Sequence, residues 1–263
     1  MNCLKTYPSD LANEEFDCIK DLIPPAKSGG RHRTLDIREV LNALFYLTKG
    51  GIQWRMLPVD FPNWKSVYNY FRQWKTDGTW IRIHDALRAQ VRRQENRHKH
   101  PTGGCLDSQS VKTTEVARAA TGFDSGKKVK GRKRHLLVDT CGLLLPVAVT
   151  AASVSDQAGA RQVFKRMRGI CKKLRKVWVD GTYRGAGWTQ FVKERYGIIL
   201  EAVTHREKVK GFAVLPHRWV VERTFAWLNL SRRLSKDYER LSESSEAFEH
   251  LAMIRLMLKR LAN

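Results

Sequence analysis

The sequence has few cysteines, and they follow no metal-binding or disulfide pattern. It has five in 263 residues, an odd number, and they are widely scattered: Cys3, Cys18, Cys105, Cys141 and Cys171. No Cys-x-x-Cys pair occurs, which argues against a zinc ribbon or finger. We therefore expect reduced thiols, as in a cytosolic protein.

Long apolar runs are also missing. No uninterrupted stretch is long enough to cross a bilayer, and the start, MNCLKTYPSDLANEEF, lacks the basic and apolar blocks of a secretory signal. A basic protein of the membrane surface is a competing reading, but it would need an amphipathic basic helix or an apolar span. We expect a cytoplasmic protein without a membrane partner.

Negative charge is scarce. The chain has 48 Lys and Arg against 26 Asp and Glu, a net charge of +22, which points to nucleic acid as the leading partner. Hydrophobic residues make up 42%, enough for a core. The length allows one large domain or two unequal ones.

The first hundred residues have the periodicity of helices, expected at 11–23, 35–48, 64–77 and 79–94. The polar segment 95–102 suggests a boundary, so we predict a helical domain over 1–98, a linker over 99–103 and a second domain over 104–263. In the third helix, capped by Asn63, we expect the apolar stripe Trp64, Val67, Tyr68, Phe71 and Trp74 to be core. Its other faces make it the candidate recognition helix of a helix-turn-helix, with DNA-contact candidates Lys65, Asn69, Arg72 and Lys75.

From residue 105 on, the hydrophobic residues no longer follow the helical period throughout, and strand-like runs appear. Short β-like runs occur at 105–111, 133–139, 143–153, 176–180 and 197–203, and helices are expected at 157–174, 186–197, 216–231 and 245–262. Periodicity alone indicates an α/β domain. Three antiparallel strands followed by alternating strands and helices is the order of a ribonuclease H-like fold, with a mixed five-stranded sheet and flanking helices.

Three acids are the strongest candidates for chemistry. Asp107 and Asp180 end two of the β-like runs, and Glu222 lies in an apolar helix. Carboxylates that converge from different elements can hold two metal ions for phosphoryl transfer. The competing readings are structural: a strand-end Asp is often a solvated end or a cap, and Glu222 could form a surface ion pair with Arg218. Burial on that helix would favour function, because a buried Glu needs a metal ion or Arg.

Other acids compete with these three. We expect a hairpin turn at Asp139, a helix N-cap at Asp156 and a solvated loop at Asp124.

Basic residues gather in two runs. The run over 126–135, GKKVKGRKRH, is either a charged edge strand or a phosphate-binding surface. For the run over 165–176 a solvated helix face is the better interpretation. The candidates for DNA contact are Lys127, Lys128, Lys130, Arg132, Lys133, Arg232 and Arg233.

Several segments together resemble the bacterial insertion-sequence DDE transposases of the insertion-sequence-five type, in the insertion-sequence-four/five superfamily. They include GIQWRMLPVDFPNW, VYNYFRQWKTDGTW, LDSQSVK, GRKRHLLVDTCGLLL, VTAASVSDQAGA, VDGTYRG and RWVVERTFAWLNLSRRLSKDYE. The resemblance implies a helical DNA-binding module, a ribonuclease H-like catalytic domain, and a metal-binding triad of Asp107, Asp180 and Glu222. The cofactor would be two Mg²⁺ ions, with Mn²⁺ as a substitute.

The wider group has a Tyr-Arg-Glu-Lys pattern around its Glu. Here Arg218 stands at the Arg position, while Leu215 and Asn229 stand at the Tyr and Lys positions. Lys236 is a candidate to replace the Lys in contacting phosphate.

The implied activity is that of a transposase that binds the ends of its insertion sequence, frees a 3′-OH and joins it to target DNA. The implied partners are double-stranded DNA, as terminal inverted repeats and target, and a second copy of the chain in a homodimer or larger assembly. The protein would be associated with the nucleoid when bound to DNA. The alternatives are a non-catalytic repressor derived from a transposase and a nuclease that cuts without joining.

Overall fold

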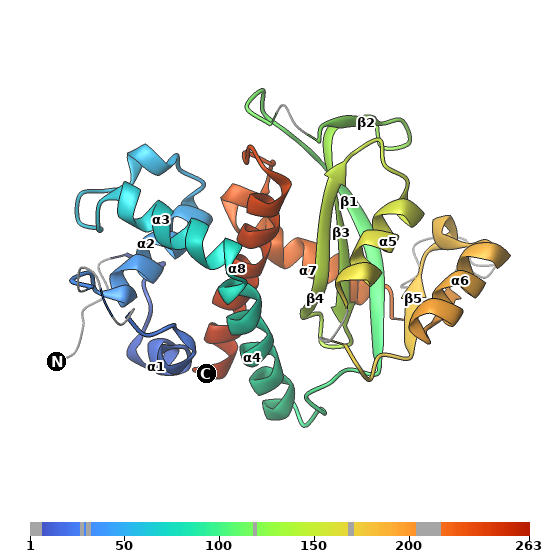
Figure 1. Ribbon diagram of the computed structural model, residues 1–263, viewed down its shortest axis with the longest axis horizontal. Coiled ribbons are helices and arrows are strands. Elements are labelled where there is room, and N and C mark those ends of the chain that lie inside the picture. The colour runs from blue at the N-terminus through green and yellow to red at the C-terminus, as the bar shows by residue number, and fades with distance from the viewer. Residues whose placement is uncertain (1–6, 27–28, 30–32, 118–119, 168–170, 204–216) are drawn as a thin grey trace. The chain divides into compact units, whose positions relative to one another are not determined.

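The computed structural model describes residues 7–26, 29, 33–117, 120–167, 171–203 and 217–263 (Figure 1). The chain forms two compact units. The first comprises Met1–Arg97, Leu230–Ser235 and Ala247–Asn263, and the second comprises His98–Asn229 and Lys236–Glu246. None of the described helices is both long and apolar enough to cross a membrane.

The first unit is helical. Its elements are α1 (Asn13–Asp17), α2 (Ile37–Gly50), α3 (Trp64–Thr76), α4 (Thr79–Gln94), most of α8 (Ser242–Leu261), and short 3-10 turns at Lys20–Leu22, Trp54–Met56 and Arg232–Leu234. The single helix expected over 11–23 is instead two short pieces.

Local sequence signals fix the ends of α2 and α3. The Asn63 side chain caps α3 by accepting from the Lys65 N–H at 3.0 Å, as predicted. Gly51, at a φ of +71°, ends α2.

The apolar stripe of α3 is only partly core. Val67, Phe71 and Trp74 are buried, and the Phe71 ring stacks on Phe248 of α8 with centroids 4.5 Å apart. Tyr68 is 40% exposed, however, so the prediction that the whole stripe is buried is wrong there.

The second unit contains a mixed sheet. Its strands are β1 (Gly103–Lys112), β2 (Gly122–Asp124), β3 (Val129–Asp139), β4 (Leu144–Ala151), β5 (Lys176–Val179) and β6 (Ile199–Ala202). The order is β2-β3-β1-β5-β6, with β4 also paired to β3. β1, β3 and β4 are antiparallel, while β5 runs parallel to β1 and β6 parallel to β5. The described sheet has six strands rather than the expected five, because β2 was not predicted.

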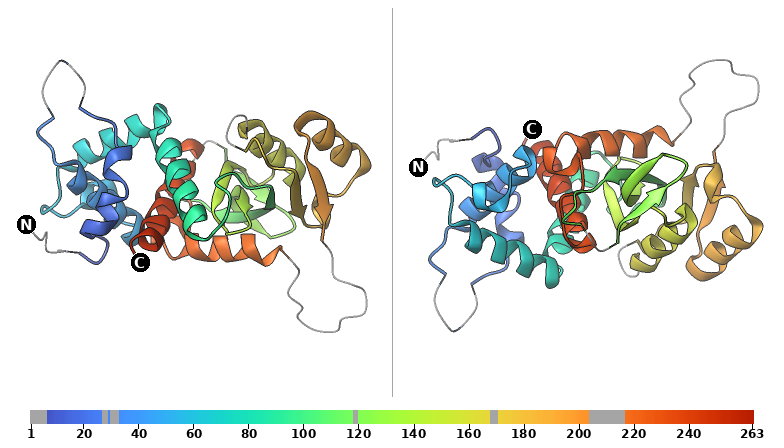
Figure 2. Two further views of the ribbon diagram at one scale, coloured as in Figure 1. Left: turned by 90° about the horizontal axis from the view of Figure 1, so that it is seen from below. Right: turned by 90° about the horizontal axis from the view of Figure 1, so that it is seen from above.

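Helices cover both faces of this sheet (Figure 2). On one face, α5 (Asp156–Arg166) and α6 (Ala186–Tyr196) bury a core that includes Leu106, Leu137 and Phe164. On the other, α7 (Trp219–Asn229) lies against β1 and β3, and the Thr224 hydroxyl donates to the Gly142 carbonyl at 2.8 Å. Successive side chains of a strand point to opposite faces, so Asp107 lies on the α7 face, next to Leu106 on the α5 face.

The C-terminal residues differ from the expected domain division. Residues 230–235 and 247–263 belong to the helical unit and not to a second domain running to 263. The aromatic contact of Phe248 with Phe71 is one reason, because it places α8 in the core around α3.

Candidate active site

Asp107 and Asp180 come from neighbouring parallel strands. Cys105 of β1 pairs with Trp178 of β5, so continuing the register by two residues brings Asp107 level with Asp180. Val177 and Val179 point into the α5 core, so Asp180 follows the strand on the opposite, α7 face. The sheet thus brings together two carboxylates that are far apart in sequence.

Asp107 is held in a partly desolvated position. Its side chain is 17% exposed, and its Oδ1 accepts from the Ser108 N–H at 2.7 Å. Burial raises its pKa to about 6, and the negative charge of Asp180 adds to this, although the Ser108 N–H and Arg218 act against it. A positive ion beside a partly desolvated carboxylate stabilises its charged form, so Asp107 is suited to binding a cation.

Asp180 caps the turn that follows β5. Its Oδ1 accepts from the backbone N–H of Thr182 at 2.8 Å and from the Thr182 hydroxyl. The sequence left open that Asp180 serves as a cap, and this interpretation is correct for its Oδ1. The cap also fixes the carboxylate at the end of the strand, beside Asp107.

Arg218 links the strand acid to the helix acid. Its Nη2 lies 3.6 Å from Asp107 Oδ2 and 3.9 Å from Glu222 Oε1. The buried side of α7, with Val221 and Thr224, packs on the sheet, but the Glu222 side chain is 59% exposed. The argument that Glu222 is buried is therefore wrong, and its connection to the site is through Arg218.

The first turn of α5 connects to both aspartate-bearing segments. Asp156 Oδ1 accepts from the Ser108 hydroxyl at 2.7 Å, next to Asp107. Gln157 Nε2 donates to the carbonyls of Thr182 at 3.3 Å and Arg184 at 2.9 Å, in the turn after Asp180.

The sequence did not reveal this connection. Asp156 was expected to be the N-cap, whereas Ser155 is the cap, through the Ala158 N–H at 3.3 Å. This frees the Asp156 carboxylate, the first residue of the helix, to reach β1.

The donor atoms suit a hard divalent cation, since Mg²⁺ prefers carboxylate oxygens. Asp107 and Asp180 can supply them, and the raised pKa of Asp107 shows that nearby positive charge only partly compensates its burial. Within the described residues, no three His, Cys, Asp or Glu side chains are already close enough to share an ion. Arg218 provides the positive charge between Asp107 and Glu222 in this structure.

Two of the competing acids have structural partners. Asp139 accepts from the N–H groups of Cys141 and Leu143, both at 2.9 Å, which confirms the hairpin turn. Asp124 is buried, so the prediction of a solvated acid is wrong. Although burial opposes it, the Ser110 hydroxyl, the Lys127 N–H and the Lys133 ammonium hold the pKa of Asp124 well below its usual range.

Three residues predicted to contact DNA are buried. Arg132 is fully buried and donates to Asp237 Oδ1 at 3.1 Å, and Lys133 pairs with Asp124 at 3.2 Å. In the helical unit, Arg233 donates to the Ile52 carbonyl at 2.7 Å. These side chains hold the fold together, which corrects the prediction that Arg132, Lys133 and Arg233 bind DNA.

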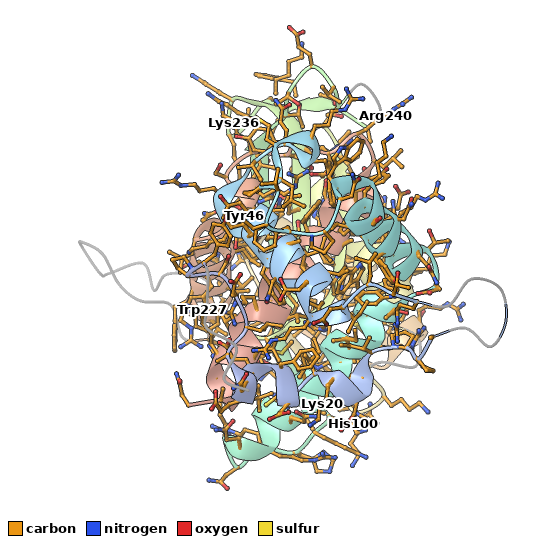
Figure 3. All side chains as sticks on the ribbon, turned by 90° about the vertical axis from the view of Figure 1, so that its left-hand side faces the viewer. Lys20, Tyr46, His100, Trp227, Lys236 and Arg240 are labelled. Carbon is orange, nitrogen blue, oxygen red and sulfur yellow. The ribbon has the colours of Figure 1, made fainter. Side chains whose placement is uncertain are left out.

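The other candidates reach the surface to different degrees. The Lys127 ammonium donates to the Ser108 carbonyl at 2.9 Å, and Lys75 is half-buried. Lys236 is exposed and is labelled in Figure 3. The remaining exposed candidates are Lys65, Asn69, Arg72, Lys128, Lys130 and Arg232. Asn229 is exposed at the end of α7, and Leu215 lies outside the described residues.

Comparison with known families covers both parts of the chain. Residues 98–257 match the family described as "Transposase DDE domain", and residues 11–84 match "Putative transposase of IS4/5 family". The chain belongs to the IS4/5 family of DDE transposases. The predicted resemblance is thereby confirmed.

Two curated relatives of this family member come from Burkholderia cepacia. One, a putative transposase for insertion sequence element IS402, is 30% identical over 125 residues, covering 45% of this chain and 58% of the relative. The other, an uncharacterized 16.2 kDa protein of the IS402 insertion element, is 30% identical over 89 residues, covering 31% of this chain and 60% of the relative. The chain therefore spans about three-fifths of the length of these relatives.

Proposed function

We propose that this protein binds the ends of its insertion sequence, cuts DNA there to free a 3′-OH, and joins that end to target DNA. The observation that carries the proposal is the parallel register of β1 and β5, which brings Asp107 level with Asp180 on the face where α7 supplies Glu222. Carboxylates from separate elements, converging at one sheet edge, suit phosphoryl transfer.

Asp107 and Asp180 would hold the divalent cations, with Glu222 completing the set. Two Mg²⁺ ions, or Mn²⁺ in their place, would stabilise the charge that develops on the attacking and leaving oxygens. Arg218, which already contacts two of these carboxylates, would orient Glu222 or contact a phosphate. Lys236 is the proposed additional phosphate contact.

The strand order β4-β3-β1-β5-β6, with three antiparallel strands and then two parallel ones, supports a ribonuclease H-like catalytic domain. In the helical unit, α3 is the proposed recognition helix of a helix-turn-helix-like module, because Lys65, Asn69 and Arg72 are exposed on it. The net charge of +22 supports binding to double-stranded DNA.

The reaction itself implies an assembly. Two element ends must be held together, so the active form would be a homodimer or larger, in the cytoplasm and on the nucleoid. A repressor that does not cut, or a nuclease that cuts without joining, would have the same fold.

The test is to incubate the protein with Mg²⁺, DNA that carries the element's ends and a target plasmid, and to sequence the products. Wild-type protein should yield 3′-OH ends and joined products. Asp107→Asn should abolish both while DNA binding survives, because one ligand charge is lost and the basic surface remains.

Glu194→Gln removes one charge from an exposed carboxylate on α6 and is the matched control; it should cut normally. Cleavage that survives in Asp107→Asn would exclude this site. Cleavage without joining would identify a nuclease, and binding without cleavage by the wild type would identify a repressor.

A further inference from the structure

A cavity of about 720 Å³ lies at the end of the sheet where β1, β2 and β3 meet. Its walls combine one aromatic ring with several cations. The residues that matter for its chemistry are Lys112, Thr121, Phe123, Lys128, Lys130 and Glu115.

Phe123 is the unusual member of this set. It lies on β2 opposite Lys130 of β3, and 56% of its surface is exposed. An aromatic side chain this exposed contributes little to the core, and its ring is free to stack on a flat ligand. Lys128 and Lys130 are exposed beside it.

Two of the cavity's residues, Phe123 and Lys130, lie on the same face of the sheet as the active-site carboxylate. On β3, Leu136 is opposite Asp107 and Lys130 is opposite Phe123. These two β3 residues are six positions apart, an even number, so Phe123 and Asp107 share a face. The separation along the strand is about 20 Å, which is the rise of about six base pairs of duplex DNA.

We propose that this cavity binds an unpaired nucleotide of the DNA strand, with the base stacked on Phe123 and the flanking phosphates on Lys128 and Lys130. Proteins bind single strands by this combination of an aromatic platform and a cationic track. A base inside a duplex is stacked on its neighbours and offers no free face to the ring. Glu115 would repel phosphates from its own side of the cavity. The sugar-phosphate backbone of the DNA would therefore follow the side with Lys128 and Lys130. The inference rests on the proposed function, since it assumes that DNA is the substrate.

The experiment compares two DNA ligands in EDTA, where cleavage cannot interfere. Both have the same duplex, one with an overhang of six thymidines and the other with six abasic nucleotides, so that their phosphates are equal and only the bases differ. Wild-type protein should bind the thymidine overhang more tightly by about 5- to 100-fold. Phe123→Ala should abolish that preference, and Phe123→Trp should retain it.

Photo-crosslinking with 5-iodouracil in the overhang, followed by mass spectrometry, should identify residue 123 as the contact. Lys128→Ala and Lys130→Ala should weaken both ligands equally. Ile199→Ala, which trims another exposed apolar side chain at 57% exposure, is the control and should change nothing.

Equal wild-type affinity for the two overhangs, or a preference that survives Phe123→Ala, would overturn the inference while leaving the proposed function intact. Failure to bind the shared duplex at all would instead count against the proposed function. Thermal melting of each variant should match the wild type, because Phe123 and Ile199 are mostly exposed.

Discussion

The two halves of one basic run, 126–135, have opposite environments. Lys128 and Lys130 are exposed at the turn of the β2–β3 hairpin and form the open half of the run, whereas Arg132 and Lys133 are buried in ion pairs and form its covered half. All four belong to the densest cluster of positive charge in the sequence. Whether a Lys or Arg side chain of this run can reach DNA thus depends on which elements of the fold cover that part of β3. It does not depend on the charge density of the sequence.

Two segments cover Arg132 and Lys133, one on each face of β3. On one face of β3, the segment 236–246 supplies Asp237 and two backbone carbonyls to Arg132. On the other, the first turn of α5 supplies Asp156 to Lys133 at 3.3 Å. Positive charge in the covered half stabilises the domain, and positive charge in the open half is available for binding.

The largest contrast should be in stability. Arg132→Ala leaves Asp237 buried without its guanidinium partner, so the free energy of unfolding should fall by about 3–5 kcal/mol. Lys130→Ala, in the open half, should change it by less than about 0.5 kcal/mol. Urea denaturation followed by circular dichroism measures both. Equal effects from the two variants would show that the halves do not differ in this way.

His135, in the covered half, should make stability depend on pH. Burial lowers its pKa to about 4, and Lys133 and Lys127 add to this although Asp156 opposes it. The unfolded chain takes up the proton near pH 6.5, so it binds more protons than the folded protein between about pH 6.5 and pH 4. This contribution is therefore lost as the pH falls through that window, by about 3 kcal/mol in all.

The measurement is the urea midpoint at a series of pH values for the wild type and for His135→Gln, which cannot titrate but can still reach the Thr150 hydroxyl. The variant should show a shallower fall in stability on acidification. Parallel curves for the two proteins would mean that the pKa of His135 is the same in the folded and the unfolded state.

The α5 turn that covers Lys133 should also affect the proposed metal site. Gln157→Ala removes the hydrogen bonds to the carbonyls of Thr182 and Arg184, which hold the turn that follows Asp180. Loss of such outer contacts typically weakens metal binding by about 10- to 100-fold. Terbium luminescence measures the affinity directly, and the Mg²⁺ concentration for half-maximal cleavage gives a second value.

Gln190→Ala, whose side-chain amide donates to exposed Glu194 in α6, is the matched control and should bind metal normally. If Gln157→Ala lowers the melting temperature without changing the metal affinity, the turn is merely structural.

The smallest effect should come from single lysines in the open half. Lys128→Ala and Lys130→Ala should each reduce the slope of log affinity against log salt by about 1, because each phosphate contact releases counterions. Lys172→Ala removes an exposed charge from the run 165–176, which we read as a solvated face, and should leave the slope unchanged. An equal loss for Lys172 would mean that the protein binds DNA through diffuse charge alone.

Local signals were enough to predict much of the fold. Asn63 as a cap, the β-like runs and the strand-end positions of Asp107 and Asp180 can all be read from a few neighbouring residues. β2 could not, because it is three residues long and lies in a Gly- and Lys-rich segment with no period to detect.

Three of the errors arose because the decisive partner comes from another element of the fold. Arg132 looked like a surface cation because Asp237, which neutralises it, is 105 residues away. Asp124 looked solvated because Lys133 reaches it only across the folded sheet. Asp156 was expected to cap its helix, but its carboxylate accepts a hydrogen bond from Ser108, which only the folded sheet brings near.

The discontinuity of the helical unit limits how the protein can be divided. A fragment ending at residue 97 would lack Phe248, the ring that stacks on Phe71, so the segment matching the IS4/5 family over 11–84 would expose core surface when expressed by itself. A ribosome must release residues 247–263 before that core can close. A premature stop codon before residue 247 should therefore impair the N-terminal unit as well.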